Sequence, residues 1–129
     1  MNLLGILTGT ILNFALAFLW YGNAFKKPWR KLTGRTPDEK PAKSQMLLAV
    51  AYAVMMSVGA DLAVNALGIA TVGSALVAGL VVGVLMLAPT ILSEWIWDKK
   101  PMRLILINTG FYALYFVLLF AVMVLMKRF

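Results

Sequence analysis

With 62% hydrophobic and only 13% charged residues among 129, the chain is too apolar for a soluble domain, since soluble domains have an apolar share of about 45–50%. It contains no cysteine and no histidine, which excludes disulfides, thiol chemistry and the usual zinc and haem ligands. We therefore expect no metal and no other cofactor. The formal net charge of +7 does not indicate nucleic-acid binding, because the basic residues flank apolar segments; anionic lipid headgroups are the expected partners.

Four apolar segments are long enough to cross a membrane. A helix needs roughly 20 apolar residues to span a hydrocarbon core of about 30 Å. The continuously apolar character of the segments is typical of helices and not of β-strands, which would alternate. The sequence therefore predicts an all-α, polytopic membrane protein with a single four-helix transmembrane domain over residues 1–129, with spans at about 3–25, 46–67, 72–97 and 104–126.

The orientation follows from the distribution of Lys and Arg. The first loop, residues 26–45, holds seven of these residues, the loop between the third and fourth spans holds three, and the opposite side holds two. Because loops rich in Lys and Arg stay in the cytoplasm, we expect an N-out/C-out arrangement in a bacterial cytoplasmic (inner) membrane. The residues expected to bind lipid headgroups are Lys26, Lys27, Arg30 and Lys31.

Asp61 is the most informative residue of the second span. It lies on one helical stripe with Ser57 and Asn65, and a carboxylate in a span costs about 2.5–3.5 kcal/mol on insertion scales. Lys127 and Arg128 are the only cations on that side of the membrane. The pattern favours an outer ion pair between Asp61 and one of them; a proton- or cation-coupled site and simple exposure at the interface are the alternatives.

The first span carries Asn13 near mid-membrane, on its small and polar face. An interhelical hydrogen bond worth about 0.6–2 kcal/mol is the expected role, and a substrate contact is the alternative.

The third span is organised by small residues. Ala75, Gly79 and Gly83 recur every four positions, a spacing that allows helices to approach closely, either within this chain or between two copies. Pro89 should bend this helix, because proline removes a backbone hydrogen bond and clashes with the preceding turn. The short connection at residues 68–71 predicts that the second and third spans are antiparallel neighbours.

A polar cluster is expected toward the cytoplasmic side. Glu94 should be neutralised by Lys99, Lys100 or Arg103 of the next loop. Because the fourth span starts on this side, its first polar residues lie at a depth comparable with Glu94 and with the end of the first span. The candidate polar cluster comprises Asn13, Trp20, Tyr21, Glu94, Asn108 and Tyr112.

Several short motifs carry a family resemblance: Leu19-Trp20-Tyr21 at the end of the first span, the run FKKPW over residues 25–29, and KPMR at residues 100–103 leading into INTGFY at residues 107–112. In these motifs the chain resembles, over nearly its full length, the small bacterial four-helix membrane proteins of domain-of-unknown-function family 1761. The resemblance implies a four-span fold and a cluster centred on Asn108. It implies no activity, because the family carries none that is established.

No sequence motif indicates catalysis. Nucleophile-elbow, P-loop and dinucleotide fingerprints are absent, so we expect that the protein is not an enzyme. A structural or accessory membrane subunit, as a homo-oligomer or in a larger complex, is the favoured role. The alternative is a small oligomeric transporter or channel that uses Asp61, Glu94, Asn13 and Asn108. A polar cavity joining Asn13, Glu94 and Asn108 would favour transport or ligand binding, whereas a dry bundle would favour the scaffold.

Overall fold

The structure is a computed structural model that describes residues 1–34 and 42–127. The helices, with π-helical turns labelled η, are α1 (Leu3–Leu19), η1 (Trp20–Ala24), α2 (Lys26–Thr33), α3 (Lys43–Ala66), α4 (Val72–Leu80), η2 (Val81–Leu87), α5 (Ala88–Trp97) and α6 (Met102–Met126). Four continuous helical segments are long and apolar enough to cross a membrane: Leu3–Ala24, Lys43–Ala66, Val72–Trp97 and Met102–Met126. The prediction of an all-α protein with four spans is confirmed, and the chain is a multi-pass membrane protein.

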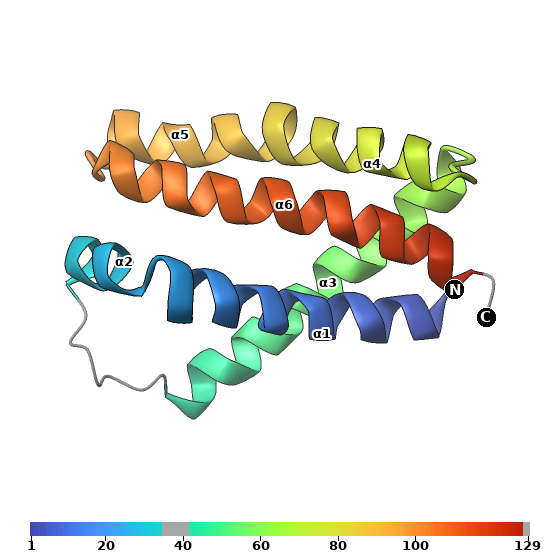
Figure 1. Cartoon of the computed structure of the whole chain (residues 1–129), viewed down its shortest axis with the longest axis horizontal. Coiled ribbons are helices and arrows are strands. Elements are labelled where there is room, and N and C mark those ends of the chain that lie inside the picture. The colour runs from blue at the N-terminus through green and yellow to red at the C-terminus, as the bar shows by residue number, and fades with distance from the viewer. Residues whose placement is uncertain (35–41, 128–129) are drawn as a thin grey trace.

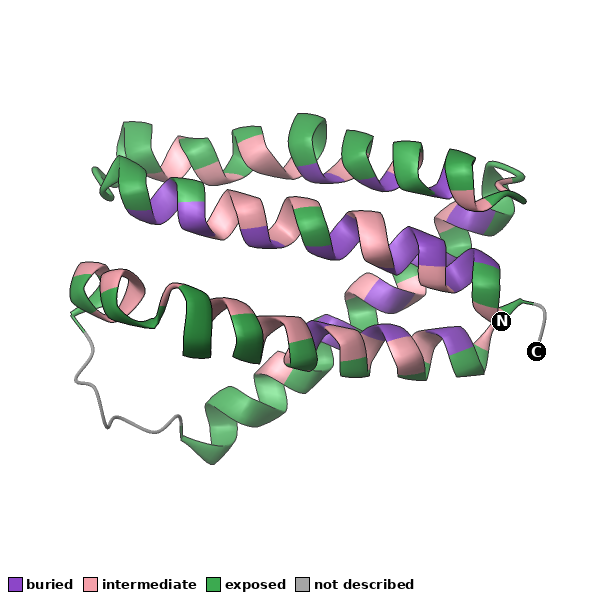
Figure 2. Ribbon diagram, viewed as in Figure 1, coloured by how far each residue is buried: buried purple, intermediate pink, exposed green. Residues whose placement is uncertain are grey.

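Helix α6 is the centre of the bundle. It packs against α1, α3, α4, η2 and α5, and Figure 1 shows it between α1 and the continuous α4–η2–α5 segment, with α3 crossing behind. Its residues Tyr115, Leu119 and Met123 are fully buried. The buried positions of the other helices face α6, whereas their outer faces are exposed (Figure 2), as expected for helices surrounded by lipid.

The second and third spans are not packed along their length, contrary to the expectation from their short connection. Helix α3 packs against α1 and α6, and α4 packs mainly against α6. The turn is tight, with Gly68 at a positive φ of 65° and the Thr71 side chain capping α4. A short turn fixes the ends of two helices but leaves their crossing angle free, so α3 diverges from α4 and its first half projects away from the bundle (Figure 1).

The small residues of the third span pack against α6 of the same chain. Ala75 is fully buried. A Cβ atom added at Gly79 would collide with the backbone of Phe116, and one added at Gly83 would lie 2.8 Å from Cα of Ala113. These glycines therefore allow the close approach of α4 and η2 to α6. The sequence left open whether the small residues pack against a helix of this chain or of a second copy, and in the structure the partner is α6 of the same chain.

Pro89 acts through a π-helical turn. Helix η2 ends at Leu87 and α5 begins at Ala88, so the widened turn lies immediately before the proline. Widening accommodates the carbonyls that a proline leaves without an N–H partner. The π-helical segment η2 thus precedes the proline at which the sequence predicts a bend.

The basic run after the first span forms a helix that the sequence reading did not predict. Helix α2 ends at Gly34, which has φ of 74°, the left-handed conformation that glycine adopts at helix C-termini. Gly34 was the signal in the sequence that could have revealed it.

Candidate functional site

The π-helical turn η1 places two aromatic residues against α6. The Tyr21 hydroxyl donates a hydrogen bond of 2.8 Å to Oδ1 of Asn108, and Trp20 Nε1 donates one of 3.0 Å to the carbonyl of Ile107. Trp20 also lies over Gly110, where an added Cβ would come within 2.9 Å of its ring. The residues that the sequence assigned to the candidate cluster at this end of the bundle are therefore brought together.

One small pocket surrounds this contact and is called the Glu94 pocket. Its volume is about 300 Å³, and it is lined by Tyr21, Trp29, Ile91, Glu94, Lys100, Asn108 and Tyr112. Glu94 pairs with Lys100 at 3.0 Å, with both side chains partly exposed. Of the three expected cations, Lys100 is thus the one that neutralises Glu94, and the pocket carries one charge of each sign.

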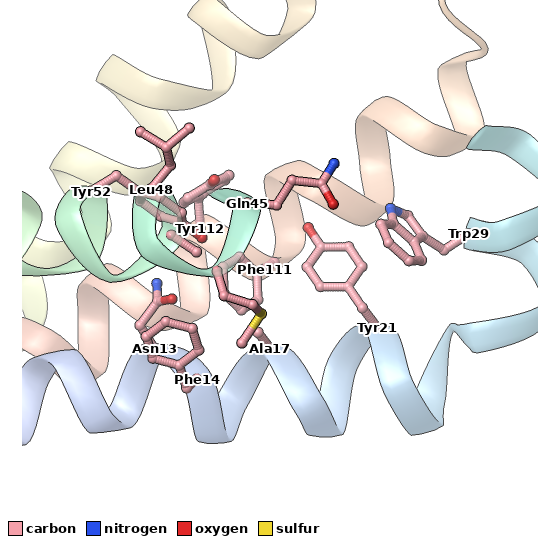
Figure 3. A pocket seen from close by; sticks show the side chains of 12 residues that line it. Asn13, Phe14, Ala17, Tyr21, Trp29, Gln45, Leu48, Tyr52, Phe111 and Tyr112 are labelled. Atoms are coloured by element: carbon pink, nitrogen blue, oxygen red, sulfur yellow. The ribbon is translucent and has the colours of Figure 1, made fainter. Parts of the chain in front are cut away.

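A larger pocket lies deeper along α1 and is called the Asn13 pocket. Its volume is about 540 Å³, and it lies between α1, α2, α6 and the first half of α3. Figure 3 shows Asn13 at one end and Trp29 beyond Tyr21 at the other. The lining residues, none of them charged, are Asn13, Phe14, Ala17, Tyr21, Trp29, Gln45, Met46, Leu48, Ala49, Tyr52, Phe111 and Tyr112.

The two pockets share a wall. Tyr21, Trp29 and Tyr112 line both of them. The Tyr21 ring lies 5.0 Å from the Trp29 ring and 5.2 Å from the Phe111 ring, centroid to centroid. The two adjacent pockets are hereafter called together the tyrosine cleft; one of them contains the Glu94–Lys100 pair and the other has Asn13 in its lining.

Asn13 is the unusual residue of this cleft. Its side chain is only 1% exposed, and within the described part of the chain neither Nδ2 nor Oδ1 has a hydrogen-bond partner. No interhelical hydrogen bond of Asn13 within 3.5 Å is found among the described residues, but the hydroxyls of Tyr52 on α3 and Tyr115 on α6 interact with its side chain, which is the kind of interhelical contact expected from the sequence. The phenol groups of Tyr52 and Tyr115 are its polar neighbours, and the Tyr115 hydroxyl donates instead to the Gly9 carbonyl at 3.0 Å.

A second polar site lies at the opposite end of the bundle. Asp61 is fully buried, and it accepts hydrogen bonds from the backbone N–H of Asn2 at 3.1 Å and from Asn65 Nδ2 at 3.3 Å. The expected pair with Lys127 is not formed: both residues line one pocket of about 560 Å³, but the ion pair found within residues 1–34 and 42–127 is Lys100–Glu94.

Asp61 does not pair with Lys127 because its carboxylate already accepts hydrogen bonds from Asn2, the N-cap residue of α1, and from Asn65 of α3. The Lys127 side chain is exposed. Arg128, the other expected partner, lies outside the described residues. No cluster of three or more His, Cys, Asp or Glu that could hold a metal ion occurs in the described part of the chain.

The four basic residues expected at lipid headgroups all lie on α2. This helix follows η1 after a single residue, and it also contributes Trp29 to the lining of both pockets.

Sequence reasoning missed Tyr52, Phe111 and Gln45 as lining residues. They come from two helices whose contact depends on the crossing of α3, and a single helix period does not show that. The combination of a tyrosine and a glutamine in the first half of the second span was the available signal.

The family assignment rests on a match to nearly the whole chain. The profile of the family described as "Protein of unknown function (DUF1761)" matches residues 4–124. The chain therefore belongs to this family, as the resemblance in the sequence indicated. No curated protein and no solved structure is similar enough to the chain to match it.

Proposed function

We propose that this member of the DUF1761 family binds a small amphipathic molecule in the tyrosine cleft. The observation that carries the proposal is the adjacency of two pockets that share three lining residues: one pocket holds a charged pair, Glu94 and Lys100, and the other has an uncharged, largely aromatic lining. A ligand with a polar end and an apolar body matches such a gradient, because binding sites combine apolar walls with a few placed polar groups.

The surroundings of the cleft support a position at the cytoplasmic face of a bacterial inner membrane. The bias of ten basic residues against two favours an inside position for α2 and Lys100. There, Lys26, Lys27, Arg30 and Lys31 would attract anionic headgroups, each contributing about 1 kcal/mol near the surface. A polar molecule would enter from the cytoplasm past Glu94 and Lys100. In an oligomer the same cleft would form the inner half of a transport route.

The first test asks whether water reaches the cleft. Because the chain has no cysteine, single cysteines can be introduced without background. Ala17→Cys and Ala49→Cys lie in the lining of the Asn13 pocket, whereas Ala51→Cys lies on the exposed face of the same helix as Ala49, outside the lining. In nanodiscs, a membrane-impermeant maleimide should label the first two variants and leave the third unlabelled, because thiols in lipid do not ionise.

Equal and negligible labelling of all three variants would overturn the proposal, since a dry cleft cannot admit a polar molecule from water. If the cleft is wet, uptake of a bound compound into proteoliposomes, compared with protein-free liposomes, separates binding from transport. Protein-dependent uptake that Glu94→Gln changes would support a transport role through this cleft, and the absence of protein-dependent uptake would restrict the protein to binding.

An accessory membrane subunit is the second candidate, and one observation favours it. The first half of α3 projects from the bundle (Figure 1) and exposes large apolar side chains, with Leu47 71% exposed. Such a face suits a helix of another protein or of a second copy. Site-specific crosslinking from Leu47→Cys in native membranes would capture a defined partner if this role is correct, and lipid alone if it is not.

A further inference from the structure

The Glu94 pocket holds a charged pair that a ligand can reach. The side chains of Glu94 and Lys100 are 38% and 47% exposed, and Nζ of Lys100 lies 3.0 Å from Oε2 of Glu94. The backbone N–H of Lys100 also donates to the Glu94 carbonyl at 3.4 Å, so the backbone keeps the two residues side by side whatever their side chains do. An exposed ion pair contributes little to stability, and a ligand can therefore open it at small cost.

The other lining residues of this pocket supply a donor and apolar surface. Oδ1 of Asn108 accepts the Tyr21 hydroxyl, and its Nδ2 group can donate to an anionic group of a ligand. The lining also contains the rings of Tyr21, Trp29 and Tyr112 and the aliphatic side chain of Ile91. Aromatic rings attract an ammonium group through cation–π interaction and pack well against apolar side chains.

The charges of the pocket select among ligands. A ligand cation that pairs with Glu94 leaves Lys100 without its counter-ion, and a ligand anion that pairs with Lys100 leaves Glu94 without one. A zwitterion replaces one ion pair by two, and each of its charged groups gains a charge-assisted hydrogen bond. The pocket therefore favours a molecule that carries both signs close together.

We infer that the Glu94 pocket binds a small zwitterion of the α-amino acid type with an apolar side chain. Its ammonium group pairs with Glu94, its carboxylate pairs with Lys100 and the Asn108 amide, and its side chain packs against the aromatic rings. The volume of about 300 Å³ is at the lower end of the range for small-molecule sites, about 300–1,000 Å³, which suits a single amino acid. This inference rests on the proposed function, whose amphipathic ligand it assigns to a chemical class.

The test uses three probes that share an indole ring and differ in charge: L-tryptophan, tryptamine, which lacks the carboxylate, and indole-3-propionate, which lacks the ammonium group. Binding to the protein in phosphatidylcholine nanodiscs is measured by equilibrium dialysis, with empty nanodiscs as the control for partition into lipid. These discs have no net charge and do not sort the probes by charge. We expect L-tryptophan to bind above the empty-disc level and each of the other probes to bind about tenfold more weakly or worse, because each lacks one of the two pairings.

Two variants assign the two charges of the ligand. Glu94→Gln should remove the preference for L-tryptophan over indole-3-propionate, because the ammonium group has lost its partner. Lys100→Gln should remove the preference over tryptamine, because the carboxylate has lost its partner. The matched controls are Asp98→Asn and Lys99→Gln, which delete one charge of the same sign at exposed residues outside the lining and should keep both preferences.

A third variant locates the ligand in the pocket. Ile91→Trp should fill the Glu94 pocket and abolish binding of L-tryptophan. Leu92→Trp is its control, because Leu92 is exposed and lies outside the lining, and this variant should bind normally. If Ile91→Trp does not fold, the two charge variants still decide the inference.

The outcomes separate the ligand class from the cleft itself. Equal binding of all three probes that Ile91→Trp abolishes would overturn the zwitterion and keep the proposed function, with a ligand recognised by the aromatic rings alone. Loss of L-tryptophan binding when phosphatidylethanolamine is added to the discs would overturn the small-molecule ligand and assign the site to a zwitterionic lipid headgroup. Binding of no probe above the empty-disc level would also overturn the inference, and the maleimide labelling then decides the proposed function independently.

Discussion

The hydroxyl of Tyr21 donates to Oδ1 of Asn108 over 2.8 Å, and this bond joins η1 to α6 at the wall that the two pockets share. Both residues line the Glu94 pocket, and Tyr21 also lines the Asn13 pocket. The Tyr21 ring is therefore part of the wall that the two pockets share.

Removing this hydrogen bond should have a measurable cost. Hydrogen bonds between side chains in membrane bundles average about 0.6 kcal/mol and reach about 1.7 kcal/mol. We expect Tyr21→Phe to destabilise the protein by an amount in this range, and Tyr21→Phe combined with Asn108→Leu to be less destabilising than the sum of the single variants. Unfolding in mixed micelles titrated with SDS measures the stability of the original protein, the two single variants and the double variant. Strict additivity would show that the two groups are not coupled.

The close contact of the third span with α6 predicts a position-specific effect of alanine. Gly79→Ala places a Cβ against the backbone of Phe116 and Val117, which cannot retreat as a side chain can, so we expect a loss of about 1–3 kcal/mol. Gly59→Ala is the matched control, because nothing lies within 4 Å of its Cβ position and alanine is the better helix former by about 1 kcal/mol.

Thermal unfolding followed by circular dichroism in detergent measures both glycine variants. A stable Gly79→Ala protein would mean that α4 and α6 pack less closely in the membrane than in the structure.

The sequence predicted the four spans well because membrane crossing depends on the length and hydropathy of each segment alone. It also brought Tyr21, Glu94 and Asn108 to one end of the bundle, since depth along a span can be counted. The Asn13 pocket could not be predicted from the sequence. Tyr52 and Phe111 face the same space only because α3 crosses the bundle obliquely, and that angle depends on packing between segments far apart in the sequence.

The expected ion pair of Asp61 was wrong for a related reason. Its partner was chosen from the charged groups at the right depth, but the rotation of each helix about its axis decides which group lies beside the carboxylate. Asp61 meets the backbone of Asn2, a donor that no side-chain pattern displays.

Asp61 should hold the start of α1 against α3. Asp61→Asn retains one acceptor oxygen but turns the other into a donor, so either the Asn2 N–H or the Asn65 amide loses its acceptor. We expect faster hydrogen exchange at the first turn of α1 and a loss of about 1–3 kcal/mol in stability. Asn65→Ala, which removes only the 3.3 Å bond at an exposed side chain, should have a smaller effect.

An Asp61→Asn protein as stable as the original would indicate that the cost of burying the carboxylate equals what its hydrogen bonds contribute. Stability would then not explain why a carboxylate is buried at this position, and the proton- or cation-coupled site becomes the explanation to pursue.

The orientation of the chain gives the last prediction. Thr33 lies at the end of α2, before the second span, and Leu67 lies in the turn directly after the second span. Both residues are exposed. If Lys and Arg set the topology, Thr33→Cys in intact cells should react with an impermeant maleimide only after the membrane is permeabilised, whereas Leu67→Cys should react without this treatment. Neither substitution changes a charge, so the bias of ten basic residues against two is preserved. Labelling of both positions in intact cells would indicate a mixture of two orientations, and the reverse pattern would place the tyrosine cleft on the outer face, where its ligand would arrive from outside the cell.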